Sequence, residues 1–61
     1  MRMFNIEDRV IVTKEIDKNY GKHGIIYCAT ELSNAPVTVY DIKFDDDSKG
    51  YYFFSEIMKE I

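Results

Sequence analysis

Short runs rich in apolar and β-branched residues recur along this chain, and some of them alternate with polar residues in the two-residue period of a β-strand. Five such segments are predicted strands: residues 9–13, 25–32, 37–44, 51–54 and 58–61. In the longest, Tyr40, Ile42 and Phe44 fall on one face, and the polar residues between them fall on the other. We therefore expect this strand to bury one face and leave the other in water, whereas the start of segment 25–32 is apolar on both faces and is expected to be covered on both sides.

Turn-forming residues separate the predicted strands. We expect loops at residues 14–20, 33–36 and 45–50. Gly21 and Gly24 are expected to take backbone angles that other residues would resist. Ser55 is expected to cap a single helical turn before the last strand. Five short strands with frequent turns predict an all-β fold, a small barrel in one domain that spans residues 1–61.

Two further predictions concern packing. The lead-in residues Met3, Phe4 and Ile6 are apolar enough to pack across one end of a barrel or to pair as an edge strand. Cys28 alternates with Ile26, which predicts a buried and inert thiol. A single cysteine forms no internal disulfide and excludes a cysteine-rich metal site.

Composition bears on the partners, the cellular location and the source genome that we expect for this chain. The net charge is −3, which weakens non-specific attraction to nucleic acid. No apolar window is long enough to span a membrane, and the N-terminus lacks the pattern of a signal peptide, so we expect a cytoplasmic protein. Residues with AT-rich codons outnumber those with GC-rich codons, which suits a phage, a plasmid or a low-GC bacterium.

Two segments resemble a known family of small barrels. The run Asp8-Arg9-Val10-Ile11-Val12, followed by Tyr20-Gly21-Lys22-His23-Gly24-Ile25-Ile26, resembles the KOW motif of SH3-like barrels. The second half, from Ile42 to Ile57, resembles their closing hairpin. The resemblance implies a five-stranded SH3-like barrel with one helical turn before the last strand. RNA-binding, protein-binding and enzyme-accessory modules share this fold, so it does not choose among functions.

The sequence gives little support to a metal site or a catalytic site. Asp45, Asp47 and Glu56 match positions of an EF-hand calcium loop, but Lys49 places a cation where a ligand oxygen belongs. We interpret the segment as a solvated acidic hairpin, and we expect no metal and no cofactor. His23 has no nucleophile linked to it by a recognisable motif, so we predict no catalytic residues.

The aromatic residues exceed what one tiny core can hide, and this surplus favours a protein partner. Tyr51 and Phe53 cannot share a strand face with Tyr52 and Phe54, so one pair should lie at the surface or beneath a loop. The predicted contacts are four aromatics with an acidic rim: Tyr20, Tyr27, Tyr51, Phe53, Asp45, Asp46 and Asp47. The leading hypothesis is a non-enzymatic protein-binding module, such as a small regulator or inhibitor. Self-association into a homodimer through a barrel edge is a second way to bury the surplus.

An alternative hypothesis is a KOW-like module that contacts RNA or the ribosome. Its phosphate-binding residues would be Arg9, Lys14, Lys18, Lys22 and His23. Acidic residues are interleaved among these cations and weaken their combined field, so this alternative ranks below a protein partner.

Overall fold

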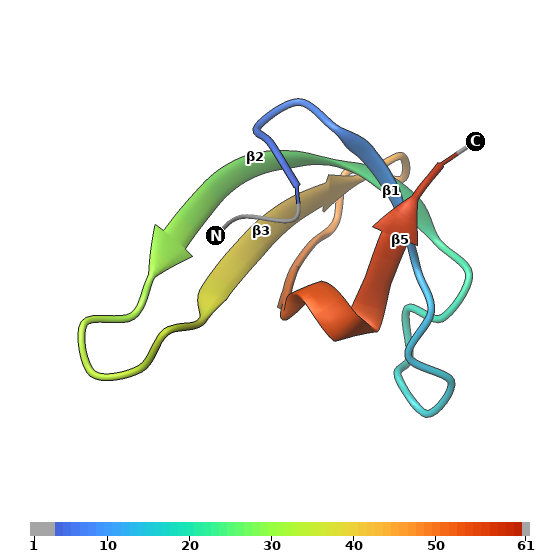
Figure 1. The fold of residues 1–61 in the computed structure, drawn as a ribbon. Helices are drawn as coiled ribbons and strands as arrows, with labels where there is room; N and C mark the ends of the chain where they lie inside the picture. The colour runs from blue at the N-terminus through green and yellow to red at the C-terminus, as the bar shows by residue number, and fades with distance from the viewer. Residues whose placement is uncertain (1–3, 61) are drawn as a thin grey trace.

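Five antiparallel strands form one sheet (Figure 1). A computed structural model describes residues 4–60. In chain order the elements are β1 (Arg9–Val12), β2 (His23–Glu31), β3 (Thr38–Phe44), β4 (Lys49–Tyr52), the 3₁₀ turn η1 (Phe54–Glu56) and β5 (Ile57–Lys59). The strand order across the sheet is β4-β3-β2-β1-β5. The predicted all-β fold, with five strands and one helical turn before the last, is confirmed.

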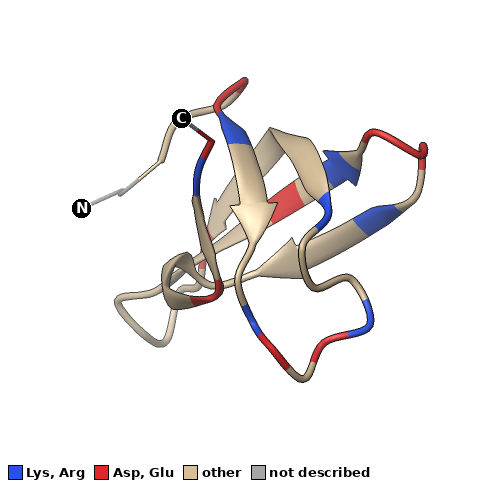
Figure 2. Ribbon diagram, turned by 90° about the vertical axis from the view of Figure 1, so that its right-hand side faces the viewer, with Lys and Arg blue, Asp and Glu red and all other residues tan. Residues whose placement is uncertain are grey.

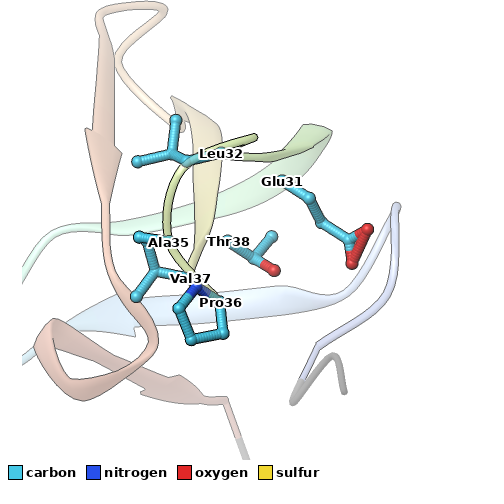
Figure 3. Close-up of a pocket in the computed structure, with 6 residues that line it drawn as sticks. All are labelled: Glu31, Leu32, Ala35, Pro36, Val37 and Thr38. Carbon is cyan, nitrogen blue, oxygen red and sulfur yellow. The ribbon is translucent and has the colours of Figure 1, made fainter.

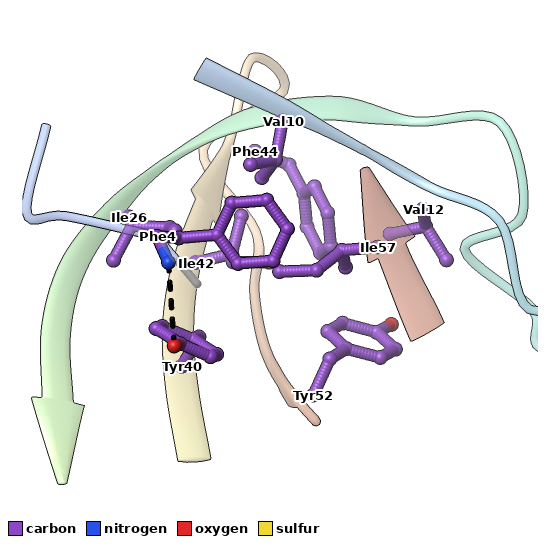
Figure 4. Packing of buried hydrophobic residues seen from close by; sticks show 9 residues of the cluster. All are labelled: Phe4, Val10, Val12, Ile26, Tyr40, Ile42, Phe44, Tyr52 and Ile57. Atoms are coloured by element: carbon purple, nitrogen blue, oxygen red, sulfur yellow. Dashed lines mark hydrogen bonds between the residues drawn. The ribbon is translucent and has the colours of Figure 1, made fainter. Parts of the chain in front are cut away.

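The sheet bends around a single apolar core. The long strands β2 and β3 curve together, and η1 leads the chain from β4 to β5 at the opposite edge (Figure 1). Nine buried side chains fill the concave side (Figure 4): Phe4, Val10, Val12, Ile26, Tyr40, Ile42, Phe44, Tyr52 and Ile57. Val10 and Val12 share the inner face of β1, as their spacing predicts. The described part of the chain holds no helix long enough to cross a membrane.

The N-terminal lead-in closes one end of this core. The ring of Phe4 packs edge-on against Tyr40, with centroids 5.4 Å apart, and its amide donates to the Tyr40 hydroxyl (Figure 4). Ile6 stays partly exposed. The expected packing of Met3 and the expected end of the last strand at Ile61 lie outside the described residues.

A β-bulge in β2 changes which residues face the core. The register slips between Ile26 and Cys28, so that Tyr27 is the extra residue. Beyond the slip, Ala29 packs against the core and Cys28 is only partly buried. The prediction of a buried Cys28 is therefore wrong, because simple alternation does not continue through a bulge.

The two glycines of the predicted turn have different roles. Gly21 has φ +84°, a conformation that favours glycine, as expected. Gly24 lies within β2 at an ordinary angle, and a Cβ there would come within 2.6 Å of the Ile42 side chain and 2.7 Å of the Lys43 carbonyl. The backbone-angle prediction for Gly24 is wrong, and the requirement at that position is close approach of β3.

The β3–β4 hairpin is tighter than expected. The Phe44 amide donates to the Ser48 carbonyl at 2.8 Å, and the Asp47 amide donates to the Phe44 carbonyl at 2.9 Å. These bonds define a three-residue loop, 45–47, in which Asp47 takes the left-handed position with φ 73°. Strand β4 consequently begins at Lys49, where the sequence pattern predicts loop.

The helical turn begins one residue earlier than predicted. Phe53, in place of Ser55, occupies the N-cap position, and its amide donates to the Glu56 carboxylate at 2.9 Å. Since β4 ends at Tyr52, the alternation stops there and Phe54 does not turn inward.

Candidate functional site

Aromatic side chains are exposed where β4 runs into η1. Tyr51 is 75% exposed, and Phe53 and Phe54 are about half exposed. Tyr51 points to the outer face because its strand neighbour Tyr52 is buried. The predicted surface pair of Tyr51 and Phe53 is therefore present, and Phe54 adds to it.

A hollow of about 200 Å³ lies beside these rings. Its lining combines apolar side chains from β3, β4 and the N-cap of η1 with one ion pair: Lys14, Val39, Tyr51, Tyr52, Phe53 and Glu56. Val39 contributes because it lies outward on β3, in phase with Asp41 and opposite to the core residue Tyr40.

A second hollow, of about 440 Å³, continues the first one along β4. The two share Lys14, Tyr51, Tyr52 and Glu56. The additional lining residues come from the β1–β2 loop and the start of β4: Asp17, Lys18, Asn19, Lys49 and Gly50. We call the combined feature the β4 groove, since β4 forms one wall and loop 13–22 the other.

Tyr52 holds the loop wall of the β4 groove in place. Its hydroxyl donates to the Asp17 carboxylate at 2.6 Å and accepts from the buried Asn19 amide at 2.9 Å. The bond from Tyr52 keeps the pKa of Asp17 below its ordinary value, and burial raises the pKa of Tyr52. The loop is therefore tied to the sheet by a polar contact beneath the groove.

Glu56 fixes the other end of the groove. Its carboxylate accepts from the Phe53 amide, which lowers the pKa of Glu56, and it pairs with Lys14 at 3.1 Å. Both acids in the groove, Asp17 and Glu56, are thus engaged by the protein's own donors.

The cations of the groove are less completely neutralised. Among the Lys and Arg residues in the described chain, five form ion pairs: Arg9, Lys14, Lys22, Lys43 and Lys59. The other two, Lys18 and Lys49, form no ion pair within residues 4–60, and both line the β4 groove. The Lys49 ammonium lies 5.4 Å from the Tyr27 ring centroid, a contact that leaves its charge uncompensated.

The acidic tip of the β3–β4 hairpin is compensated by neighbouring cations. Figure 2 shows this tip wholly acidic, whereas charges of both signs follow one another along loop 13–22. Asp45 makes a two-pronged pair with Arg9, and Asp46 binds Lys22 at 2.8 Å. Hydrogen bonds from these cations lower the pKa of both acids. The predicted acidic rim therefore lies at the far end of β4 and is bound to the protein's own side chains.

Two of the cations predicted to bind nucleic acid, Arg9 and Lys22, are the ones that bind the acidic hairpin tip. Arg9 pairs with both Asp45 and Glu60, and His23 also contacts Glu60. Bonds from His23 and Arg9 lower the pKa of Glu60. Lys14 pairs with Glu56, so Lys18 alone of the five predicted cations has no ion pair in the described chain. The structure does not gather these cations into one unneutralised patch.

The remaining predicted aromatics lie around the groove at different distances. Tyr27 is half exposed on the outer face of β2 and reaches the groove through its contact with Lys49. Tyr20 is exposed in loop 13–22, but none of its described contacts joins it to Tyr51 or Phe53.

Several exposed or lining residues were absent from the predicted protein-binding site, and Val39, Lys49 and Ile16 show why. Val39 could have been predicted, because an apolar β-branched residue on the solvent-facing side of segment 37–44 indicates that this part of the face is covered or binds something. Lys49 was missed because it was assigned to the hairpin loop. Ile16 lies between two acids in loop 13–22 and is 91% exposed. It was not predicted as a contact because the segment around it was predicted to be a solvated loop.

Another hollow, of about 250 Å³, lies at the tip of the β2–β3 hairpin (Figure 3). Leu32, Pro36 and Val37 contribute apolar surface to it, and Glu31 is the charged residue in its lining. It lacks the aromatic side chains of the β4 groove and has no lysine or arginine in its lining. No group of three or more His, Cys, Asp or Glu residues within residues 4–60 is arranged to hold a metal ion.

Comparisons with family models, with curated proteins and with solved structures find no match to this chain.

Proposed function

We propose that this chain is a non-enzymatic protein-binding module that holds a segment of a partner protein in the β4 groove. The observation that carries the proposal is Tyr51, which is 75% exposed beside an apolar hollow instead of lying in the core. Exposed tyrosines suit recognition, since each offers a large apolar area and a hydroxyl at low conformational cost. A role as a small regulator or inhibitor, on a KOW-like SH3-like barrel, is consistent with such a site.

A rigid groove supports this function better than a mobile surface would. Loop 13–22 is held by the bonds of Tyr52 to Asp17 and Asn19, and η1 is held by Glu56. Both walls are thus ordered before a partner arrives, which reduces the entropy lost on binding.

RNA or ribosome contact is a weaker second candidate. Arg9, Lys14 and Lys22 are each engaged in an ion pair. The net charge of −3 also opposes a polyanion. Lys18 and Tyr51 are the features that favour it, and the experiment below tests it as well.

The test is retention of a partner by immobilised protein, followed by titration of the purified partner. Tyr51→Ser together with Phe53→Ser should weaken its binding at least about tenfold. Met58→Ser, an exposed apolar change on β5, is the matched control and should leave binding unchanged. Equal losses in both variants, or an RNA that binds tightly at physiological salt, would contradict the proposed function.

A further inference from the structure

The backbone of β4 has one unpaired side within the described chain. Strand β3 pairs with β4, and β4 ends the sheet order. The Phe44 amide bonds the Ser48 carbonyl, and antiparallel pairs alternate along the ladder. Gly50 and Tyr52 therefore direct their backbone groups toward β3, whereas Lys49 and Tyr51 direct theirs toward the groove. An extended peptide satisfies such groups by adding one more strand.

The charges beside this edge select an acidic peptide. Lys18 and Lys49 line the same end of the β4 groove, and neither forms an ion pair within residues 4–60. The Lys49 ammonium lies beside the Tyr27 ring of β2, and a side-chain rotation turns it toward the edge when a carboxylate arrives. Asp17, the acid nearest to Lys18 in sequence, is occupied by Tyr52 and by the Asn19 amide. The protein as a whole carries −3 charges, so these two cations mark the place where a carboxylate is favoured.

The other end of the groove selects an apolar residue. Val39 and Phe53 line only this end, and Tyr51 lies between the two ends. The groove therefore offers cations, a strand edge and an apolar hollow along one line.

We propose that the partner contributes an extended acidic segment that adds to β4 as a further strand. The segment places a carboxylate between Lys18 and Lys49 and an apolar side chain against Val39 and Phe53. This inference rests on the proposed protein-binding function and names the chemistry of the bound segment.

Two other occupants fit the groove less well. A nucleic acid would also meet Lys18 and Lys49, but two cations beside Asp17 and Glu56 are a weak site for a polyanion. A second copy of this chain would bring its own Lys49 to the edge, where like charges oppose pairing.

The direct test is an NMR titration of the full chain with a capped eight-residue peptide of alternating valine and aspartate. Binding should move the amide signals of Lys49 and Tyr51 most, together with those of residues 14–19. The same peptide with lysine in place of aspartate should bind at least about tenfold more weakly. Of the two sets of alternate peptide amides, N-methylation of the set that faces β4 should abolish binding, because it removes the donors that pair with the strand edge.

Charge reversal in the groove supplies the matched pair of variants. Lys18→Glu with Lys49→Glu should weaken binding of the acidic peptide at least about tenfold. The control is the single change Lys59→Glu, compared with Lys49→Glu alone: it makes the same change in net charge at a lysine that has only a 3.7 Å ion pair, and it should change binding less than about threefold.

Several outcomes would overturn the inference. Absence of binding by the acidic peptide would do so, as would equal binding by its N-methylated form or equal effects of Lys49→Glu and Lys59→Glu. Tighter binding of an eight-residue oligo-dT would favour a nucleic acid instead. A dimer that already protects the Lys49 and Tyr51 amides would favour a second copy of the chain. A natural partner that is lost in Tyr51→Ser but insensitive to the Lys18/Lys49 reversal would overturn the acidic-strand inference alone. A partner insensitive to Tyr51→Ser would overturn the proposed function itself.

Discussion

Tyr52 joins three parts of the molecule through one side chain. Its ring belongs to the core and packs against Phe44, with centroids 6.3 Å apart. Its hydroxyl reaches out of the core to Asp17 and Asn19 in loop 13–22. The residue is therefore both a core side chain and the anchor of a groove wall.

Replacement of Tyr52 by Phe tests this anchor. The ring remains, but Asn19 loses its acceptor and Asp17 loses its donor, so the free energy of unfolding should fall by about 1–2 kcal/mol. The pKa of Asp17 should rise toward its ordinary value of 3.8, as followed by NMR titration. Tyr51→Phe removes an exposed hydroxyl and is the control. An unchanged Asp17 pKa in Tyr52→Phe would contradict the assigned role.

Gly24 and Gly21 give a second test at single residues. Gly24→Ala places a methyl group 2.6 Å from Ile42 within a packed strand pair and should destabilise the protein by about 2–3 kcal/mol. Gly21→Ala meets no neighbour within 4 Å and should cost about 1 kcal/mol, from its positive φ alone. Urea unfolding compares the two. A larger loss for Gly21→Ala would show that close approach is not what position 24 requires.

At the scale of elements, the β3–β4 hairpin decides where β4 and its edge lie. Its three-residue loop places Asp47 at φ 73°, a position that glycine occupies at lower cost. Asp47→Gly should therefore raise the free energy of unfolding by about 0.5 kcal/mol, despite the loss of a long ion pair to Lys43. Asp47→Ala should lower it. Thermal unfolding measures both, and a destabilised Asp47→Gly variant would contradict the assigned loop geometry.

The elements show which features of the fold alternation could predict. The inner faces of β1 and β3 followed from the spacing of Val10, Val12, Tyr40, Ile42 and Phe44, because these strands keep an unbroken two-residue period. The face of β2 on which Cys28 lies could not be predicted from alternation, because the bulge between Ile26 and Cys28 depends on how β2 pairs with β3 and has no recognisable sequence pattern.

The site could be predicted in part for the same reason. Tyr51 and Phe53 were identified because alternation forbids burial of every aromatic residue between 51 and 54. The β4 groove as a whole was not predicted, since it needs loop 13–22 to meet β4 across a long sequence separation. That contact depends on the Tyr52 hydroxyl, and a tyrosine predicted to be buried gives no indication of where its hydroxyl points.

At the scale of the described chain, residues 4–60, hydrogen bonds lower the pKa values of five carboxyl groups: Asp17, Asp45, Asp46, Glu56 and Glu60. A group whose pKa is lower in the folded state stabilises that state above its ordinary pKa, here 3.8 to 4.5, and loses this contribution as pH falls through the folded value. The free energy of unfolding should therefore decrease from about pH 5 to pH 2.

Urea unfolding at several pH values checks this dependence. Glu56→Gln removes one of the five groups and should make the dependence shallower, while its side-chain carbonyl still accepts from the Phe53 amide. Stability that increases on acidification would mean that these ion pairs and hydrogen bonds do not form in solution.

We expect the partner protein to bind in the β4 groove. Amide hydrogen exchange of the chain, with and without the partner retained by the immobilised protein, tests the claim most directly. Partner binding should slow exchange at Lys49, Tyr51 and residues 14–19, and should leave exchange unchanged at residues 32–37 and in β5. Protection confined to the β2–β3 hairpin tip or to β5, with the β4 edge unchanged, would contradict it.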